Sequence, residues 1–335
     1  GGSGRIRHIK FPGTRGSCTM VSIAITVCSR RRPRMLKRCL TSIFEEFAVN
    51  GGDDFVVVVE NDTSPKSARV VEDLSRTFPE VPVHYELETE PGIPFARNRT
   101  LDIARRKGAD WIAFIDDDEQ VRPGWLDAMR RAAQSLGAQA LTGPVVRICA
   151  DEEPAWLKAN DGKPRQHGQV LERAATNNTL VDLRWLAAQQ ELLRFDERLR
   201  YTGGSDTEFF YRFVKCGGVI KWVSDAEVTE EVPAARMTMR WQVNRKTRTQ
   251  ANNVRLYRIH NGFSRAAARY VPAAVRRIVL RGVPSCAAAV FMRPISKQRS
   301  DQIWFYGRRT IGSGVGALFG LFDRELEPYR VIEGE

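Results

Sequence analysis

The spacing of hydrophobic residues along the first 141 positions changes repeatedly between a pattern typical of strands and one typical of helices. Short runs rich in β-branched and aromatic residues, as expected of buried strands, occur at residues 21–27, 55–59, 83–87 and 111–115. Apolar residues at helical spacing lie between them, at residues 36–47, in a segment running through Leu74, and at residues 95–103. This alternation with short connections predicts the α/β class, with a doubly wound, mostly parallel sheet and helices on both faces.

Polar residues directly follow three of the expected strands, at Ser29–Arg32, Glu60–Asp62 and Asp116–Asp118. Ligands of such sheets bind at the carboxyl ends of the strands, so we expect the three segments to share one ligand-binding edge. Three adjacent carboxylates repel one another, and a divalent cation carrying a diphosphate would relieve that repulsion. A solvated acidic turn is the alternative, but the position after a buried strand, level with two other polar segments, favours a metal site.

A second candidate segment is Gly203–Asp206, in a middle third of less regular pattern. Its two glycines permit a close approach of the backbone to a ligand. Asp206 opens an expected helix whose apolar residues include Phe209 and Phe213. A carboxylate at this position either caps the helix or serves chemistry, and the segment alone does not distinguish the two roles.

The positive charge of the chain is concentrated in one region. The whole sequence carries a formal charge of +12, yet residues 232–300 contain 15 Lys and Arg and no Asp or Glu, which leaves 37 basic and 40 acidic residues elsewhere. Within this region, Val275 and Val279 accompany Arg276 and Arg281 as in an amphipathic helix. No apolar window is long enough to span a bilayer, so the pattern predicts a helix lying on an anionic membrane surface, with a solvated helix packed on the main domain as the alternative.

Composition and pattern divide the chain into three parts. These are a leader at residues 1–19 that lacks periodicity and begins like an expression tag, a catalytic domain at residues 20–235, and a basic, mostly helical extension at residues 236–335. The six cysteines show neither a CxxC pair nor zinc-ligand spacing, and no secretory segment is recognisable. These features predict a cytoplasmic protein whose extension attaches peripherally to the cytoplasmic face of the inner membrane.

From about Val21 to Gln250 the order of these segments resembles that of family 2 glycosyltransferases with the GT-A fold. The resemblance rests on Ser29–Pro33 (T-Y-N-R-P in the family), Glu60–Asp62 (V-D-D or V-D-N-D), Gly92 with Ala96–Asn98 (G-x-x-x-A-R-N), Asp116–Asp118 (D-x-D) and Gly203–Asp206 (G-G-E-D). A looser match relates Arg236, Arg240, Trp241 and Arg245 to the family's R-x-x-R-W segment. The chain departs from the family pattern at Arg30, Glu60 and Ser205, where the family has tyrosine, aspartate and glutamate.

The resemblance implies an enzyme that moves a sugar from a nucleoside-diphosphate donor, with a UDP-sugar as first choice, to a hydroxyl of a glycan or lipid-linked acceptor with inversion. Asp118 with Asp116 would bind Mn²⁺ or Mg²⁺, and Asp206 would be the catalytic base. The residues expected to contact the donor are Ser29, Arg32, Glu60, Asn61, Arg97 and Asp116. Arg245 and Arg248 join them because guanidinium groups match phosphate geometry. Asp117 receives no role.

Two other functions compete with this interpretation. A sugar-nucleotide nucleotidyltransferase uses a similar sheet and acidic metal site, but the segment after the first strand has three arginines and no glycine to form a phosphate loop. A nucleic-acid-binding protein would use the basic region, whose arginines show no interleaved aromatic stacking pattern and form no recognised module. We therefore expect no nucleic-acid partner, and an anionic membrane surface accounts for the charge better.

Overall fold

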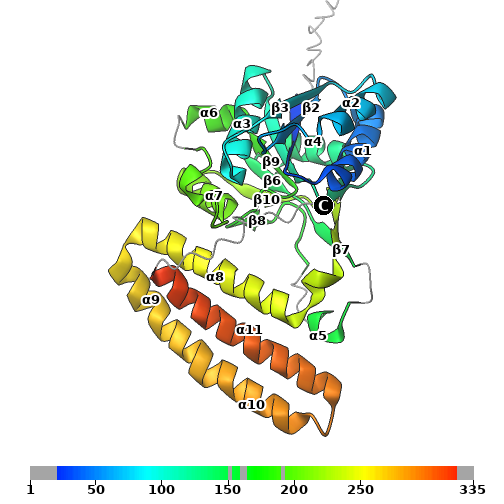
Figure 1. Ribbon diagram of the computed structural model, residues 1–335. Coiled ribbons are helices and arrows are strands. Elements are labelled where there is room, and N and C mark those ends of the chain that lie inside the picture. Colours follow the sequence, from blue (N-terminus) through cyan, green and yellow to red (C-terminus); the bar gives the residue numbers. More distant parts are fainter. Residues whose placement is uncertain (1–20, 150–152, 159–163, 190–192, 323–335) are drawn as a thin grey trace, which may run out of the picture.

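The computed structural model describes residues 21–149, 153–158, 164–189 and 193–322, and Figure 1 shows an α/β unit above a bundle of long helices. The expected leader at residues 1–19 lies outside the described residues. An eight-stranded sheet forms the centre of the α/β unit, in the order β3-β2-β1-β4-β9-β6-β10-β8. The expected fold class, a mostly parallel α/β sheet with a helical C-terminal part, is confirmed.

The four strands expected from the sequence lie side by side and parallel in one half of this sheet. They are β3 (Val83–Leu87), β2 (Phe55–Glu60), β1 (Ile23–Ser29) and β4 (Trp111–Asp116). The register pairs Ser29 with Glu60 and Cys28 with Asp116, so the polar segments after these strands start level with one another. The chain adds β2 and β3 on one side of β1 and then β4 on the other. The carboxyl ends of β1 and β4 are therefore the switch point where such sheets bind ligands.

The middle third of the chain is more ordered than its sequence pattern indicates. It contributes β9 (Thr179–Asp182), β6 (Ala140–Thr142), β10 (Ile220–Trp222) and β8 (Val170–Leu171) to the main sheet, and β9 runs antiparallel between β4 and β6. A second sheet joins β5 (Glu119–Val121), β11 (Val228–Val232) and β7 (Val145–Cys149). In strands of two to five residues, apolar and polar side chains alternate too few times for the sequence pattern to distinguish a strand from a loop.

Helices cover both faces of the main sheet because alternate residues of a strand point in opposite directions. One face carries α1 (Pro33–Asn50), α2 (Ala68–Thr77) and α4 (Trp125–Ser135), and the other carries α3 (Ile93–Arg106), α6 (Leu183–Ala188) and α7 (Ser205–Lys215). In β1, Ile23, Ile25 and Val27 contribute to the first core and Ala24 to the second. These side chains are fully buried, so the strand ends that carry the polar segments rest on a tightly packed support.

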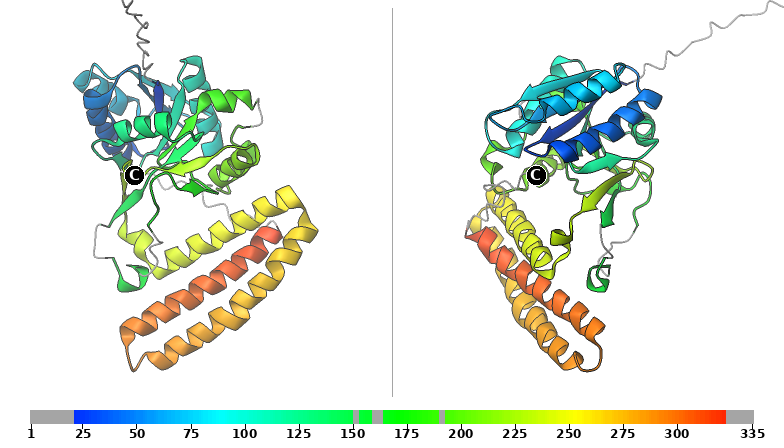
Figure 2. Two further views of the ribbon diagram at one scale, coloured as in Figure 1. Left: turned by 180° about the vertical axis from the view of Figure 1, so that it is seen from behind. Right: turned by 45° about the vertical axis from the view of Figure 1, so that its right-hand side comes forward.

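From Met239 onward the chain forms a bundle of long helices, coloured yellow to red in Figures 1 and 2. In chain order they are α8 (Met239–Asn261), α9 (Phe263–Val275), the π-helical segment η4 (Arg276–Gly282), α10 (Val283–Met292) and α11 (Lys297–Leu321). Helical backbone angles continue across both junctions of η4, so α9, η4 and α10 form one continuous helix. We call this the outer helix, because α11 packs between it and α8. Within the described residues, no helix is both long and apolar enough to cross a membrane.

Several contacts connect the bundle to the α/β unit, along α8 and along α11. Asn252 Nδ2 of α8 donates a 3.0 Å hydrogen bond to the carbonyl oxygen of Thr202, next to the start of α7. The ring of Trp156 in α5 (Ala155–Lys158) lies 4.5 Å from the ring of Phe305 in α11. Two 3₁₀ turns, η2 (Glu197–Leu199) and η3 (Ala234–Met237), precede α7 and α8 respectively. The helical bundle is thus packed directly against the segment that contains Gly203–Asp206.

Glycines let α11 approach its neighbours closely. A Cβ at Gly316 would overlap the backbone carbonyl of Thr247, and one at Gly320 would overlap the carbonyl of Ala251, both on α8. The backbone of Gly307, on the same helix, lies against Gly282 of the outer helix. Small residues at these positions are therefore required by the distance between the helices.

We expect Gly316→Ala to lower the free energy of unfolding by about 1–3 kcal/mol, because the added methyl group must push α11 away from α8. A fall in stability would be informative, because helix propensity alone predicts a rise: within a helix, alanine is intrinsically favoured over glycine by about 1 kcal/mol. Urea denaturation followed by circular dichroism measures the change. Ala287→Val, on the exposed side of α10, is the control and should shift stability by less than about 1 kcal/mol. A Gly316→Ala protein as stable as the parent would contradict the close packing.

Candidate active site

The loops after β1 and β4 are joined through Asp117. Ser29 Oγ donates a 2.8 Å hydrogen bond to Asp117 Oδ2, and Arg32 Nη1 donates one of 3.3 Å to Asp117 Oδ1. Burial raises the pKa of the Asp117 carboxyl to about 6, and the charge of Arg32 opposes that rise. Sequence reasoning gave this residue no role. In the structure it ties Ser29 and Arg32, both expected to contact the donor, to the acidic segment.

Asp118 lies between two arginines. Its Oδ2 is 4.0 Å from Arg32 Nη1 and 3.7 Å from Arg236 Nη1. Arg236 also donates a 3.0 Å hydrogen bond to Glu230 Oε1 on β11. Burial and the charge of Asp118 raise the pKa of Glu230, whereas Arg236 and Arg245 lower it. Glu230 was missed by sequence reasoning because a Glu-Glu pair in a short strand has no distinctive pattern. The structure adds it to Asp116, Asp117 and Asp118, and we call these four carboxylates the acidic cluster.

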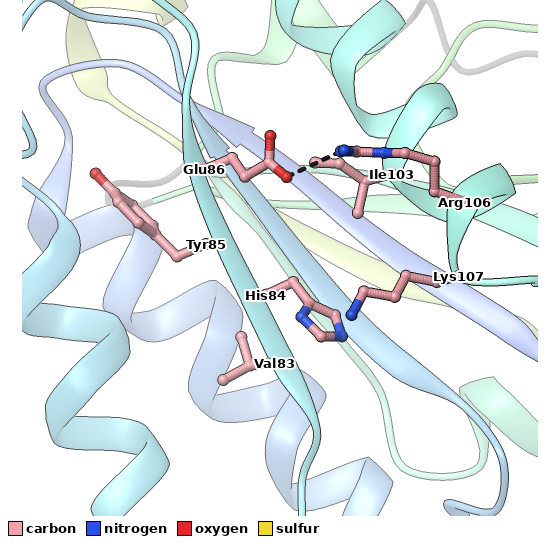
Figure 3. Close-up of a pocket in the computed structure, with 7 residues that line it drawn as sticks. All are labelled: Val83, His84, Tyr85, Glu86, Ile103, Arg106 and Lys107. Carbon is pink, nitrogen blue, oxygen red and sulfur yellow. Dashed lines mark hydrogen bonds and ion pairs between the residues drawn. The ribbon is translucent and has the colours of Figure 1, made fainter.

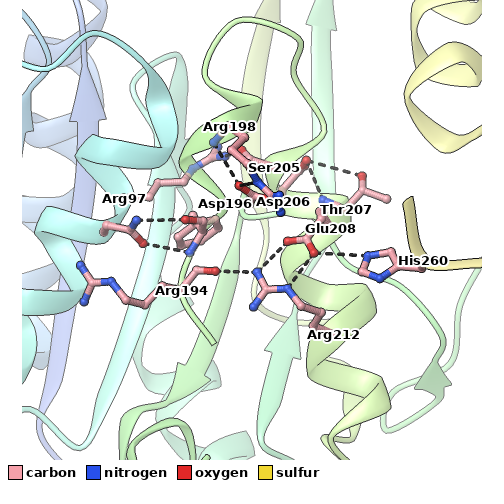
Figure 4. Close-up of polar contacts among 12 residues, drawn as sticks. Arg97, Arg194, Asp196, Arg198, Ser205, Asp206, Thr207, Glu208, Arg212 and His260 are labelled. Carbon is pink, nitrogen blue, oxygen red and sulfur yellow. Dashed lines mark hydrogen bonds and ion pairs between the residues drawn. The ribbon is translucent and has the colours of Figure 1, made fainter. Parts of the chain in front are cut away.

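Arg97 connects the acidic segment after β4 to the start of α7. Its Nη2 lies 3.7 Å from Asp116 Oδ1, and its Nη1 donates a 3.2 Å hydrogen bond to Ser205 Oγ. Its side chain is only 12% exposed and lies over the ring of Phe195, 5.6 Å from the ring centre. Figure 4 shows Arg97 on its helix across from Ser205 and Asp206. Two segments about 90 positions apart in the sequence therefore border one site.

The surroundings of Asp116 disfavour its negative charge. Desolvation and the carboxylates of Asp118, Asp117 and Asp206 raise the pKa of Asp116 to about 7, although Arg97 opposes them. The side chain is nevertheless 44% exposed, so its neighbouring groups desolvate the carboxyl group only in part. The contribution of Asp206 indicates that the candidate base and the acidic segment interact electrostatically. Such an environment favours binding of a cation.

The carboxylates fit the expected divalent metal ion by their chemistry. Among the residues described, no three His, Cys, Asp or Glu side chains are grouped so that they could hold a metal ion together. Mg²⁺, however, is commonly held by one or two carboxylates and completes its shell with substrate phosphates and water. Asp116 and Asp118 offer the oxygen ligands that Mg²⁺ and Mn²⁺ prefer. The residues present therefore suit an ion that arrives with a diphosphate.

Asp206 occupies the first turn of α7, after two glycines in left-handed conformation. Gly203 and Gly204 have φ values of 75° and 84°, a region that other residues rarely adopt. A Cβ at Gly204 would also lie 3.4 Å from Asn252 of α8. Asp206 Oδ1 accepts a 2.8 Å hydrogen bond from the backbone N–H of Thr207. The glycines thus allow a sharp turn that places the partly exposed Asp206 carboxylate beside Arg97 and Asp116.

The orientation of α7 is supported by an ion pair within the helix and by a contact between its buried Glu208 and α8. Arg212 donates hydrogen bonds of 2.7 and 2.6 Å to the two carboxylate oxygens of Glu208. His260 Nε2 of α8 lies 3.4 Å from Glu208 Oε1, and the His260 ring is tilted against the ring of Tyr211, with 4.6 Å between the ring centres. Figure 4 shows Glu208 and Arg212 on the helix that begins with Ser205, with His260 facing Glu208 from a neighbouring helix. The bundle therefore fixes the helix that carries the candidate base.

The two arginines expected from α8 differ in their placement. Arg245 lies over the ring of Trp241 at 5.2 Å, and its effect on the pKa of Glu230 places its charge beside the acidic cluster. Arg248 is half-buried and makes no hydrogen bond or ion pair within the residues that the structure describes. The structure thus brings Arg245 to the site and shows no contact between Arg248 and the other expected residues.

Glu60 and Asn61 are buried and already have protein partners. Glu60 accepts hydrogen bonds from the backbone N–H and the hydroxyl of Ser67, at 2.8 and 3.1 Å, and from the hydroxyl of Tyr85 at 2.5 Å. Asn61 Nδ2 donates to the carbonyl oxygens of residues 88 and 90, and its Oδ1 accepts from the N–H of Gly92. These bonds fix the loops after β2 and before α3. The expected contacts of Glu60 and Asn61 with the donor stay a prediction.

A cavity of about 500 Å³ lies away from this cluster, at the edge strand β3. Figure 3 shows His84 and Glu86 of β3 facing Arg106 and Lys107 at the end of α3. Arg106 and Glu86 form a 3.0 Å ion pair there. No residue of the acidic cluster lines this cavity. The candidate site is thus identified by its chemical groups and its place at the switch point of the sheet.

Comparison with known sequences places the chain among characterised families. The model of a family described as Glycosyl transferase family 2 matches residues 22–204. The succinoglycan biosynthesis protein ExoM of Rhizobium meliloti (strain 1021) is 32% identical over 320 residues, which cover 93% of this chain and 96% of ExoM. The succinoglycan biosynthesis protein ExoO of the same organism is 32% identical over 145 residues, or 39% of this chain and 40% of ExoO.

A comparison with solved structures finds the same fold in a distant protein. The mannosyltransferase PcManGT from Pyrobaculum calidifontis, solved in complex with GDP-Man and Mn²⁺, superposes with a TM-score of 0.57 at 17% identity. The match covers 90% of this chain and 88% of that one. At this identity the likeness concerns the arrangement of helices and strands.

Proposed function

The chain belongs to glycosyltransferase family 2 and is a transferase, and we propose that it moves a sugar from a nucleoside-diphosphate donor to a hydroxyl of a growing glycan. The relative that matches it over nearly the whole length is named for succinoglycan biosynthesis. This name supports an oligosaccharide acceptor of an exopolysaccharide, free or lipid-linked. The observation that carries the proposal is the link through Arg97, which brings the start of α7 beside the end of β4.

Asp206 is the proposed catalytic base. Its carboxylate would accept the proton of the attacking hydroxyl while the bond between the hydroxyl oxygen and the anomeric carbon forms. The bond between that carbon and the diphosphate breaks in the same displacement, and its electron pair leaves with the nucleoside diphosphate. A single displacement inverts the configuration at the anomeric carbon. Asp206 is half-exposed at the start of α7, and its Oδ1 accepts a hydrogen bond from the N–H of Thr207. Both features suit a catalytic base.

The acidic cluster and its arginines would bind the diphosphate. Asp118, with Asp116, would hold Mn²⁺ or Mg²⁺, and such an ion neutralises charge on a departing diphosphate. Arg32 and Arg236 each lie within 4.0 Å of Asp118. Guanidinium groups bind phosphate oxygens through paired hydrogen bonds. We therefore assign these two arginines, with Arg245, to the diphosphate side of the donor.

A donor screen without acceptor tests the proposal. The protein is incubated with UDP-, GDP- and dTDP-sugars in the presence of Mn²⁺ or Mg²⁺, and free nucleotide is measured. We expect slow release of the nucleoside diphosphate from one class of donor, and loss of that release after chelation of the metal, because water can replace the acceptor hydroxyl. If no donor is hydrolysed and none binds, the proposed donor class is wrong.

A companion assay, in which a nucleoside triphosphate and a sugar 1-phosphate replace the sugar donor, tests the nucleotidyltransferase alternative. That reaction would release pyrophosphate from a nucleoside triphosphate and a sugar phosphate, whereas glycosyl transfer releases a nucleoside diphosphate. Family membership supports the second outcome. Pyrophosphate as the product would overturn the assignment of Asp206 as the base that activates an acceptor hydroxyl.

A further inference from the structure

Large exposed hydrophobic side chains are concentrated on the outer helix and the turn after it. Between residues 275 and 295 they are Val275, Val279, Leu280, Val283, Val290, Phe291 and Ile295, with exposed fractions from 52% to 79%. In the described part of the α/β unit such side chains are fewer and dispersed, as at Val49 and Val170, with Val146 and Ile148 as a pair on β7. Single exposed apolar residues are normal in proteins, whereas a contiguous group indicates an interaction surface.

These side chains form one face because the opposite face of the outer helix is packed against α11. Ala274, Gly282 and Ala289 are buried, and Gly282 lies against Gly307 and Ile311 of α11. Phe291 follows Ala289 by two residues, roughly 200° of rotation around the helix, and is 79% exposed. Figures 1 and 2 show the outer helix at the edge of the molecule farthest from the main sheet. The apolar face therefore points away from the rest of the protein.

The charged residues of the outer helix itself and of the turn after it are all positive. Arg276, Arg281, Arg293 and Lys297 are exposed beside the apolar side chains, and no acidic residue occurs between Glu231 and Asp301. A symmetric contact between two copies would place the same patch on both sides of the interface and bring these cations together. An anionic lipid surface instead offers hydrocarbon for the apolar side chains and phosphate groups for the arginines.

We propose that the outer helix is a membrane-docking surface that lies flat on a bilayer containing anionic lipids. Leu280, Phe291 and Ile295 insert between the acyl chains, and Arg276 and Arg281 contact the phosphates of the headgroups. In this orientation α11 and α8 separate the bilayer from the main sheet. The protein thus works at the membrane surface, with its sheet turned away from the lipid. This inference does not depend on the donor, the metal or the acceptor.

Flotation of the full chain with lipid vesicles tests the surface. One vesicle preparation contains phosphatidylcholine alone, and the other also contains phosphatidylglycerol. We expect strong binding to the anionic vesicles and weak binding to the neutral ones. Leu280→Gln with Phe291→Gln should weaken binding to the anionic vesicles by about tenfold or more, since both side chains lose their favourable transfer into hydrocarbon. Val49→Gln, 80% exposed on α1 of the α/β unit, is the matched control and should bind like the parent.

A second pair of variants tests the charges. Arg276→Gln with Arg281→Gln should weaken binding to anionic vesicles by about tenfold or more and flatten its dependence on salt. Lys37→Gln with Arg69→Gln removes two exposed cations from α1 and α2 and should have little effect. Circular dichroism of every variant checks that the helices are intact. We expect them to be, because the replaced side chains are exposed.

Three results would overturn the proposal. The first is absence of binding to anionic vesicles by the parent chain. The second is equal loss of binding in the control and the test variants, which would place the contact elsewhere. The third is a dimer in analytical ultracentrifugation that becomes monomeric in Leu280→Gln with Phe291→Gln, because the apolar face would then be covered by a second copy.

Discussion

Replacing Asp206 with asparagine is expected to lower kcat by about 100- to 10,000-fold, the range typical for loss of a general base. Donor affinity should stay close to that of the parent. The amide oxygen of asparagine can still accept the hydrogen bond from Thr207 N–H, so the start of α7 keeps its geometry while the proton acceptor is lost. Steady-state kinetics with the identified donor, together with calorimetry of donor binding, separates the two effects.

The control for this experiment is Asp225→Asn, which makes the same chemical change at an exposed carboxylate before β11. It should leave both kcat and donor affinity unchanged. If Asp206→Asn turns over at near the parent rate, Asp206 is not the base. If donor binding falls as far as kcat does, the carboxylate holds the donor and does not activate the acceptor.

Replacing Asp118 with alanine is expected to abolish the metal-dependent part of nucleoside-diphosphate binding. The affinity in the presence of Mn²⁺ should fall by at least about 100-fold, because even loss of a residue that only supports a metal ligand costs up to that factor. Affinity measured with a chelator should be unchanged or improved, since Arg32 and Arg236 lose a competing carboxylate. Calorimetric titration of the nucleoside diphosphate, with and without metal, gives both values.

Asp53→Ala is the matched control for the metal prediction. Asp53 is exposed and lies two residues before Phe55, where β2 begins, so it is at the amino end of the parallel strands, opposite the edge that carries Asp118. Its removal changes the net charge by the same amount without touching the acidic cluster. Equal losses of Mn²⁺-dependent binding in both variants would show a general charge effect. Unchanged binding in Asp118→Ala would count against the metal assignment.

Elements with a long and regular pattern could be predicted from the sequence. The run Phe55–Val59 is apolar at every position because β2 is covered on both faces, and the structure buries each of these residues. The short strand β9 could not be predicted, because its four residues pair antiparallel with β4 and β6 only after distant parts of the chain have met. The fold class was therefore predictable, whereas the order of the strands in the middle third was not.

In the candidate site, too, some residues could be predicted from the sequence and others could not. The acidic segment after β4 and the glycines before Asp206 stood out by residue type alone. The role of Asp117 did not, since three adjacent aspartates look alike until Ser29 and Arg32 select one of them as a buried anchor. Glu60 offers the converse case. Its place at the end of a strand indicated a donor contact, which stays a prediction, and only the structure shows that its bonds to Ser67 and Tyr85 also connect the end of β2 to the loop before α2 and to β3.

The sequence by itself determined the family, the sheet with its helices, and the carboxylates that could serve chemistry, because these depend on local pattern and residue type. It also determined that positive charge is concentrated near the C-terminal helices. Only the tertiary structure decided that Arg97 links the segments of Asp116 and Asp206, and that the apolar side of the outer helix has no partner within the described chain. Both depend on packing between segments far apart in the sequence, and the spacing of residues along one segment carries no information about which distant surface it will meet.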